Sequence, residues 1–204
     1  ADRLLGVSRK LGLENKRQED YSEQENWSEA LQNHLVIIGF GLNGSNLAKA
    51  AAASQIPYVV IEMNPDTVKR EKAKGIPILY GDATQDHLLE KVHISHARAA
   101  VVAISNAAAT RDITRNIRQH SESLFLVVRT RYVKDTNELL ALGADQVIPE
   151  EFETSVQIFS QVMHNFLVPE GEIQSLVDQV RSDNYQLFQS DFKVPKTYRP
   201  SALV

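Results

Sequence analysis

Six short apolar runs, separated by stretches with helical character, constrain the fold of this chain more than any other feature. Each run has about four to six residues, is rich in Val and Ile, and does not alternate apolar with polar residues. The first is HLVIIG, from residue 34, and the last is DQVIPE, from residue 145. Continuous apolar runs are typical of strands buried on both faces of a parallel sheet. The pattern therefore predicts an α/β fold with a doubly wound, six-stranded parallel sheet and right-handed crossovers.

Capping residues indicate where the intervening helices begin and end. Asn64 is a favourable N-cap, Pro65 suits the first helical position, and Gly75 suits the end of that helix. The other helices are expected over residues 43–53, from Asp82 or Thr84, from Asn106, and over residues 133–142. Helix and strand thus alternate through the whole middle of the chain.

A longer helix is expected after the last strand, over residues 151–167. Its apolar residues recur at steps of four and three, the period of one helix face. A helix that closes the edge of its own sheet explains such a stripe, but this one is broad enough to cross to a partner subunit as well. The stripe consists of Phe152, Val156, Phe159, Met163 and Phe166, and Ile158 and Val162 broaden it.

The segments that flank this region are polar. Residues 1–33 indicate a charged linker, residues 34–167 hold the sheet and the long helix, and residues 168–204 form a C-terminal extension. The chain begins with Ala rather than Met, so we expect a fragment or a processed product. The longest apolar-looking run without a charge, residues 99–110, is far shorter than the ~20 residues of a membrane-spanning helix, so the fragment itself is expected to be soluble.

The composition excludes several classes of function. Lys and Arg number 22 against 26 Asp and Glu, which argues against a dedicated nucleic-acid binder. Because the chain has no cysteine, disulfides, zinc–thiolate sites, iron–sulfur clusters and thiol catalysis are excluded. His93 and His96 have the spacing of a metal pair, but without a third ligand we expect a surface loop and no metal site.

A GxGxxG motif follows the first apolar run and precedes an alanine-rich helix: Gly39-Phe40-Gly41-Leu42-Asn43-Gly44. In this context Gly39 permits a tight turn, Gly41 lets the backbone approach a phosphate, and Gly44 lets the helix pack on the strand. The free N–H groups and the positive dipole end of that helix would face the anion. The motif therefore predicts a phosphate-binding turn.

Glu62 ends the second apolar run, eighteen residues past Gly44, close to the usual ~20. A carboxylate at this position accepts hydrogen bonds from both ribose hydroxyls of an adenosine. It would also repel a 2′-phosphate, so NAD or a plain adenine nucleotide is favoured over NADP.

Further candidate residues follow the third, fourth and fifth strands, because ligands of this fold gather at the carboxyl ends of the strands. Asp82 is expected to hold an adenine amino group, to cap the next helix, or to do both. Arg129 rather than Arg131 is expected to face the crevice, since alternate strand residues point oppositely. These strand ends are Gly81-Asp82-Ala83-Thr84, Ala103-Ile104-Ser105-Asn106, and Arg129. A basic stripe on the fourth helix, Arg111, Arg115 and Arg118, is expected to be a solvated face or otherwise a docking surface.

Four stretches together resemble the RCK/KTN (TrkA-N) regulatory domain of bacterial potassium channels and transporters. They are HLVIIGFGLNGSNLA, VVIEMNPD, GIPILYGDATQDHLLEKVHI and VKDTNELLALGADQVIPEEFE. The resemblance covers about residues 34–167. Within the family, the polar lead-in and single unit look most like the C-terminal domain of Kef-type potassium efflux systems, which are cation:proton antiporters.

The resemblance implies a Rossmann-like fold that binds AMP or NAD(H) as a ligand without turning it over. It also implies a homodimer formed through the crossover helix at about 151–167, and control of ion flux through an attached or associated membrane transporter. The location implied is the cytoplasmic side of the bacterial inner membrane. The family's nucleotide contacts correspond here to Gly39, Phe40, Gly41, Leu42, Asn43, Gly44, Glu62, Met63, Asn64, Asp82, Ala83 and the end of strand four. Glutathione-gated members carry arginine where this chain has Leu42, which argues against glutathione control.

We therefore expect a nucleotide-sensing gating domain rather than an enzyme. Two alternatives stay open at this point. A small NAD-dependent oxidoreductase would need a substrate pocket and a catalytic acid from residues 168–204, where the sequence offers no such residue. A free-standing regulatory subunit of a potassium-uptake system would be distinguished by the absence of transmembrane helices upstream in the same gene.

Overall fold

The computed structural model describes residues 31–183 and 185–189, which fall into two compact units. Unit 1 comprises the described residues up to Thr130 together with Asn137–Ile148. Unit 2 comprises Arg131–Thr136 and the described residues from Pro149 onward. Most of the expected linker and the end of the expected extension lie outside the described residues.

Unit 1 is built on a six-stranded sheet in the order β3-β2-β1-β4-β5-β6. β1 lies at the centre and pairs in parallel with β2 on one side and β4 on the other, with Leu35 opposite Tyr58 and Ala99. The prediction of a doubly wound parallel sheet is confirmed. The strands are β1 (Leu35–Ile38), β2 (Tyr58–Glu62), β3 (Ile78–Tyr80), β4 (Ala99–Val102), β5 (Phe125–Thr130) and β6 (Gln146–Pro149).

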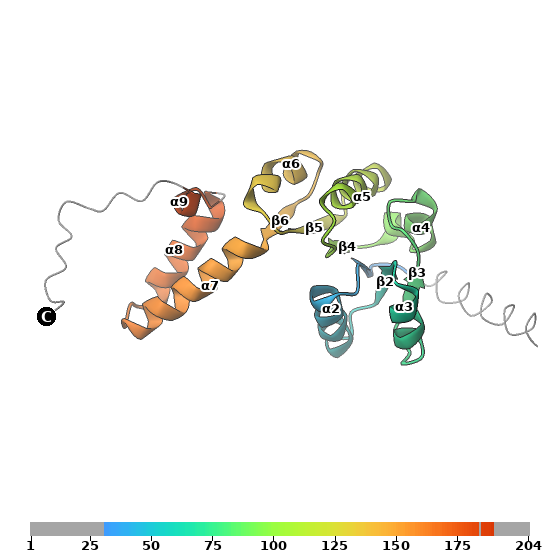
Figure 1. Ribbon diagram of the computed structural model, residues 1–204, viewed down its shortest axis with the longest axis horizontal. Coiled ribbons are helices and arrows are strands. Elements are labelled where there is room, and N and C mark those ends of the chain that lie inside the picture. Colours follow the sequence, from blue (N-terminus) through green and yellow to red (C-terminus); the bar gives the residue numbers. More distant parts are fainter. Residues whose placement is uncertain (1–30, 184, 190–204) are drawn as a thin grey trace, which may run out of the picture. The chain divides into compact units, whose positions relative to one another are not determined.

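Helices lie on both faces of this sheet, and the central strands β1 and β2 are buried on both sides. Ile37 and Val60 pack on the face of α2 and α3, whereas Val36, Ile38 and Val59 pack on the face of α4, α5 and α6. Figure 1 shows α2 and α3 on one side of the strands and α4 and α5 on the other. Burial of each such side chain stabilises the fold by about 1.5–3 kcal/mol. The helices are α2 (Leu42–Ala53), α3 (Pro65–Lys72), α4 (Asp86–Lys91), α5 (Ala107–His120) and α6 (Thr136–Ala141), with 3-10 turns at η1 (Ile94–His96) and η2 (Val133–Asp135).

Helices α3 and α5 begin where their capping residues predict, whereas α4 begins later than expected. The Asn64 side chain accepts two backbone N–H bonds of 3.0 Å at the start of α3, and the Asn106 side chain accepts one of 3.0 Å at the start of α5. The expectation that α4 begins at Asp82 or Thr84 is wrong, because α4 begins at Asp86. Asp82 instead bonds the N–H of Thr84, which forms a local turn before the helix.

Arg118 corrects the interpretation of the basic stripe on α5. Its guanidinium donates to the carbonyl oxygens of Gly143, Ser121, Glu122 and Leu124 and pairs with Asp145 at 2.9 Å. The side chain is only 19% exposed. It therefore fastens the end of α5 to the segment before β6, and it is neither solvated nor part of a docking surface. The other two arginines, at 111 and 115, pair with acidic side chains at the surface.

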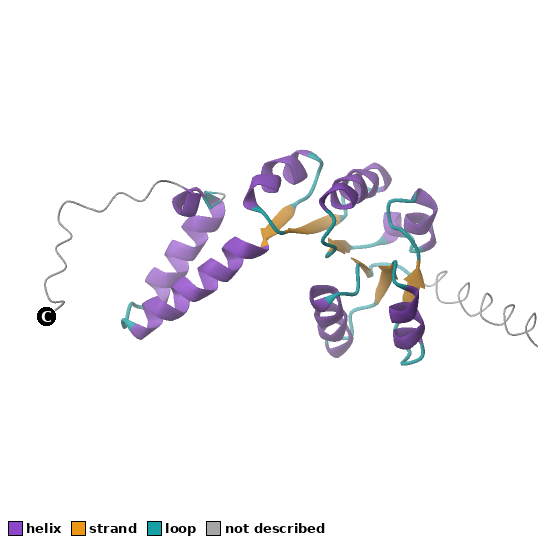
Figure 2. Ribbon diagram, in the orientation of Figure 1, coloured by secondary structure: helices purple, strands orange, loops and turns teal. Residues whose placement is uncertain are grey.

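Unit 2 is a pair of antiparallel helices, α7 (Glu150–Asn165) and α8 (Glu170–Ser182), followed by the short helix α9 (Gln186–Gln189) (Figure 2). Val156 of α7 is buried against Ile173, Val177 and Val180 of α8. Three further residues of the expected stripe pack against this cluster, namely Phe152, Phe159 and Met163. The polar-looking extension thus contains the helix that covers four of the five stripe residues within the same chain, whereas Phe166 stays exposed.

A polar cluster joins the helices of unit 2. Arg181 donates two bonds of 3.0 and 2.7 Å to the two carboxylate oxygens of Glu153, and the Tyr185 hydroxyl donates a third of 2.5 Å. The hydrogen bond from Arg181 is the main cause that holds the pKa of the Glu153 carboxyl below its ordinary value. Burial, and then the bond to Glu153, raise the pKa of the Tyr185 hydroxyl. The cluster therefore fixes how α8 and α9 lie on α7.

Candidate functional site

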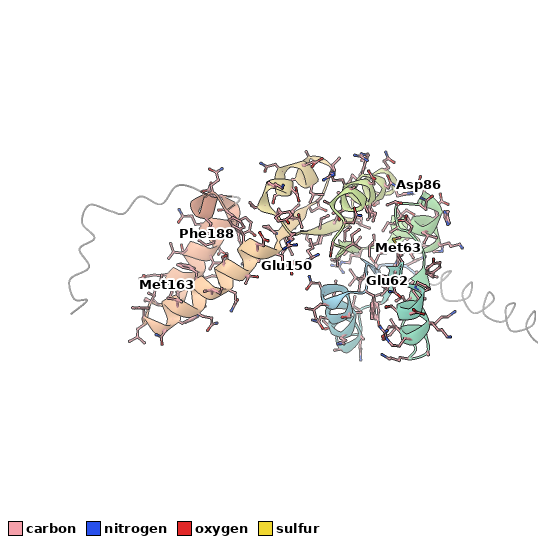
Figure 3. All side chains as sticks on the ribbon, in the orientation of Figure 1. Glu62, Met63, Asp86, Glu150, Met163 and Phe188 are labelled. Atoms are coloured by element: carbon pink, nitrogen blue, oxygen red, sulfur yellow. The ribbon has the colours of Figure 1, made fainter. Side chains whose placement is uncertain are left out.

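A crevice of about 300 Å³ opens at the carboxyl ends of the central strands of unit 1. Its walls come from the ends of β1, β2, β3 and β4 and from the first two turns of α5. Figure 3 labels Glu62 and Met63, which lie side by side where β2 ends. This is the edge of a doubly wound sheet at which ligands are expected. The lining residues are Ile38, Gly39, Ile61, Glu62, Met63, Gly81, Asp82, Ala83, Ile104, Ser105, Asn106, Ala109 and Ile113.

Each of the three motif positions is glycine for a different physical reason. Gly39 has φ +95°, a conformation that other residues adopt only with strain. A β-carbon on Gly44 would lie 1.9 Å from the Gly39 carbonyl oxygen, so only glycine lets α2 approach β1 this closely. Gly41 has an ordinary φ of −69°, and a β-carbon there would meet no protein atom within 4 Å. The fold thus requires glycine at two of the positions and leaves open space at the third.

The first turn of α2 presents the features of an anion site. Gly41 is the N-cap residue, and because it has no side chain it cannot satisfy the amides that begin the helix. These amides and the helix dipole give the start of α2 a partial positive charge. Open space at Gly41 lets a negatively charged group reach the amides without contact with a β-carbon.

Glu62 is held in place by two backbone amides from different segments. Its Oε2 accepts the N–H of Phe40 at 2.6 Å, and its Oε1 accepts the N–H of Asn64 at 2.8 Å. The carboxylate therefore ties the glycine turn to the start of α3. Because each carboxylate oxygen has two lone pairs, each retains acceptor capacity for a hydroxyl group of a ligand.

The loop after β3 places a second carboxylate on the wall of the crevice. Asp82 Oδ1 accepts the N–H of Thr84 at 3.0 Å, and the backbone oxygen of Asp82 accepts the N–H of Gln85 at 3.0 Å. Accepting one N–H leaves the carboxylate further lone pairs for an amino group in the crevice.

The predicted site residues divide into those that line the crevice and those beside it. Seven line it: Gly39, Glu62, Met63, Asp82, Ala83, Ile104 and Ser105. Outside the lining set are Phe40, Gly41, Leu42, Asn43 and Gly44 of the glycine turn and first turn of α2, and Asn64, Thr84 and Ala103 next to lining residues. The N–H of Phe40 already donates to Glu62, so it is not available to an anionic ligand.

Arg129, which was expected to face the crevice, is not among its lining residues. Its guanidinium donates to the carbonyl oxygen of Ile104 at 3.2 Å. Arg131, the alternative, belongs to unit 2 and pairs with Glu151 at 3.4 Å.

Sequence reasoning missed four lining residues: Ile38, Ile61, Ala109 and Ile113. Two of them end the central strands, and their apolar character already marked them as core. The other two, Ala109 and Ile113, share one face of α5 at a spacing of four residues. That spacing was the available signal, since the helix that follows a strand end starts beside any ligand bound there.

His93 and His96 lie with ring centroids 6.0 Å apart, and the described part of the chain has no group of three or more potential metal-ligating side chains. Among residues 31–183 and 185–189, no helix has both the length and the apolar character needed to cross a membrane.

Comparison with known proteins gives consistent matches. A family model described as the TrkA-N domain matches residues 35–150, more than half of the chain. A curated relative, a protein named as a putative K(+) efflux antiporter KefB from Alkalimonas amylolytica, is 32% identical over 163 residues, or 80% of this chain. The chain spans only 25% of the length of that relative.

Two solved structures share the fold. The TrkA-N domain of the Escherichia coli inner membrane protein YbaL superimposes with a TM-score of 0.62 at 25% identity, covering 64% of this chain and 97% of that one. The Kef C-terminal domain of Shewanella denitrificans, solved in an AMP-bound form, has a TM-score of 0.62 at 21% identity, covering 77% of this chain and 96% of that one.

Proposed function

Because the chain belongs to the TrkA-N domain family, we propose that it is a regulatory domain that binds an adenine nucleotide and gates a potassium efflux transporter. The nucleotide occupies the crevice of unit 1 as a ligand and is not turned over. AMP and NAD(H) are the candidate ligands. The domain acts on the cytoplasmic side of the membrane, next to a transporter in the same chain or an associated one.

The start of α2 is the observation that carries this proposal. The fold itself explains glycine at 39 and 44, but no protein atom lies where a β-carbon of Gly41 would be. A phosphate that approaches the amides of the first turn accounts for glycine at this third position. The phosphate would receive N–H bonds and the field of the helix dipole.

Two carboxylates would bind the ribose and the adenine of the nucleotide. Glu62 would accept the ribose hydroxyls through lone pairs that the amides of Phe40 and Asn64 leave open. Asp82 would accept a hydrogen bond from the adenine amino group. A 2′-phosphate would meet the Glu62 charge, so NADP is expected to bind more weakly than NAD.

The relatives support the link to potassium efflux. The antiporter relative is named for K(+) efflux, and the Kef C-terminal domain of Shewanella denitrificans was solved in an AMP-bound form. In the proposed mechanism the nucleotide binds one arrangement of the domain more tightly than another and shifts the population toward it. The shift reaches the transporter only to the extent that the two affinities differ.

A homodimer through α7 is the second part of the proposal. The α8 helix covers Phe152, Val156, Phe159 and Met163 in the same chain, so these residues are unsuited to hold a partner. Ile158 and Phe166 remain 61% and 74% exposed, and Val162 and Leu167 are exposed beside them. The spacing of 158, 162 and 166 places them on one helix face. This second face would meet its equivalent in another copy of the chain.

Thermal denaturation with and without AMP tests nucleotide binding. AMP should raise the Tm of the wild type, because a ligand that binds only the folded state stabilises it. Gly41→Val and Glu62→Ala should each abolish the increase. Gly171→Val is the matched control. A β-carbon at Gly171 also meets no atom within 4 Å, but this glycine belongs to α8 and not to the crevice. Unchanged increases in both crevice variants would contradict the assignment.

Sedimentation equilibrium tests the dimer. Ile158→Asp combined with Val162→Asp should convert a dimer to a monomer. Gln157→Asp, on an exposed position of the opposite side of α7, should leave the dimer intact. A wild type that is monomeric at every concentration would refute this part.

A further inference from the structure

One face of α5 runs along the wall of the crevice and continues past it. Asn106, Ala109 and Ile113 line the crevice. Asn116 lies one turn further on, at spacings of three, four and three residues that keep a helix face in line. Its side chain is therefore directed to the same side as those lining residues.

Asn116 is bonded to the loop that carries Asp82. Its Nδ2 donates to the carbonyl oxygen of Thr84 at 3.0 Å, across 32 residues of sequence. The N–H of the same Thr84 donates to Asp82 Oδ1, also at 3.0 Å. The backbone of Thr84 is thus held on both sides, once by α5 and once by the crevice carboxylate.

This arrangement restricts the carboxylate of Asp82. Asp82 accepts from the N–H of Thr84, so the direction of its free lone pairs depends on where the backbone of Thr84 lies. Asn116 sets that position from a helix that also lines the crevice. Asn is a poorer helix former than Ala, so helix propensity gives no reason for an amide side chain at this position.

We propose that Asn116 is a positioning residue that makes the crevice selective for adenine over a 6-oxo purine. This inference rests on the proposed function, because it assumes a nucleotide whose base lies at Asp82. A correctly directed carboxylate accepts a hydrogen bond from the 6-amino group of adenine. The same carboxylate repels the 6-oxo group of hypoxanthine, which offers only an acceptor there.

Titration calorimetry on the whole chain tests the proposal with three ligands: AMP, IMP and ribose 5-phosphate. For Asn116→Ala we expect the Kd of AMP to rise about tenfold, as the loss of one hydrogen bond allows. The Kd values of IMP and ribose 5-phosphate should change less than about twofold. Asn116→Asp, which keeps the shape but has no N–H to donate, should show the same loss of selectivity. Gln119→Ala, an exposed amide on the same helix, is the control and should leave all three unchanged.

The outcomes separate this proposal from the one it rests on. A wild type that binds none of the ligands overturns the proposed function and this inference with it. A wild type that binds AMP, with variants whose AMP-to-IMP ratio is unchanged, overturns only the role of Asn116. A purely structural tether would weaken the three ligands equally, and that result would also overturn it.

Discussion

The crevice end of the sheet and the α7–α8 pair differ in how their sequences specify them. At the crevice, the backbone within a few residues decides which side chains fit. The φ of +95° at Gly39 and the close approach of Gly44 to a carbonyl oxygen permit only glycine. In the helix pair, the rule is that an apolar face must be covered, and the covering helix lies elsewhere in the chain.

The difference shows what a residue pattern can and cannot specify. Backbone conformation is decided within a few residues, so a motif of six letters predicts its own geometry. Burial of a helix face is decided by any complementary surface, whether it belongs to the same chain or to another. A broad stripe therefore indicates a contact without naming the partner.

The largest expected effect is at Gly44. Gly44→Ala would place a β-carbon 1.9 Å from the Gly39 oxygen, so the helix must move away from the strand. We expect the free energy of unfolding to fall by about 3 kcal/mol, measured by urea denaturation. A loss below about 1 kcal/mol would contradict the local rule at this end of the sheet.

The helix pair is tested by two valines of α7 that differ in burial. Val156→Ala removes two methyl groups from the core between α7 and α8 and should lower the free energy of unfolding by about 2 kcal/mol. Val162→Ala removes the same groups from an exposed position and should cost less than about 0.5 kcal/mol. Equal losses in urea denaturation would show that α8 does not cover the stripe.

A smaller effect is expected at Glu153, and it depends on pH. The pKa of its carboxyl is lowered in the folded state, so its stabilisation is complete above the unfolded value of about 4.3 and is lost as pH falls through the lowered pKa. Glu153→Gln should cost about 1 kcal/mol at pH 7 and flatten the acid limb of the stability profile. Glu172→Gln, on the surface of α8, is the control. If Glu153→Gln loses stability at low pH as the wild type does, other titratable groups cause that loss.

The smallest effect on stability is expected at Gly41. Gly41→Ala places its β-carbon in open space at an ordinary φ, so the free energy of unfolding should change by less than about 0.5 kcal/mol. The same variant should lose most of its affinity for AMP in calorimetry. A variant that loses stability as Gly44→Ala does would show that the fold, and not a ligand, needs this glycine.

The sequence predicts the sheet, most of the helix starts, and the two carboxylates of the crevice, Glu62 and Asp82. Six apolar runs predict six parallel strands, and Asn64 and Asn106 cap the helices that they precede. The start of α4 was misplaced because an aspartate can close a turn with the same bond it would use as a cap.

Other features depend on contacts far apart in the sequence. Arg118 lies in a polar stretch of sequence that is typical of a surface helix, yet it donates to the carbonyl oxygen of Gly143, 25 residues away. Asn116 reaches a carbonyl oxygen 32 residues away. The residues of α8 have a helical apolar spacing at 173, 177 and 180, but the polar residues between them concealed it. Pairing over such distances follows from the fold and cannot be derived from local pattern.

A crystal structure of the protein grown with AMP would show whether the nucleotide occupies the crevice. We expect density in the crevice of unit 1, with the phosphate on the amides at the start of α2 and the ribose hydroxyls on the Glu62 carboxylate. AMP bound at another surface, or a crevice without nucleotide at saturating AMP, would contradict it.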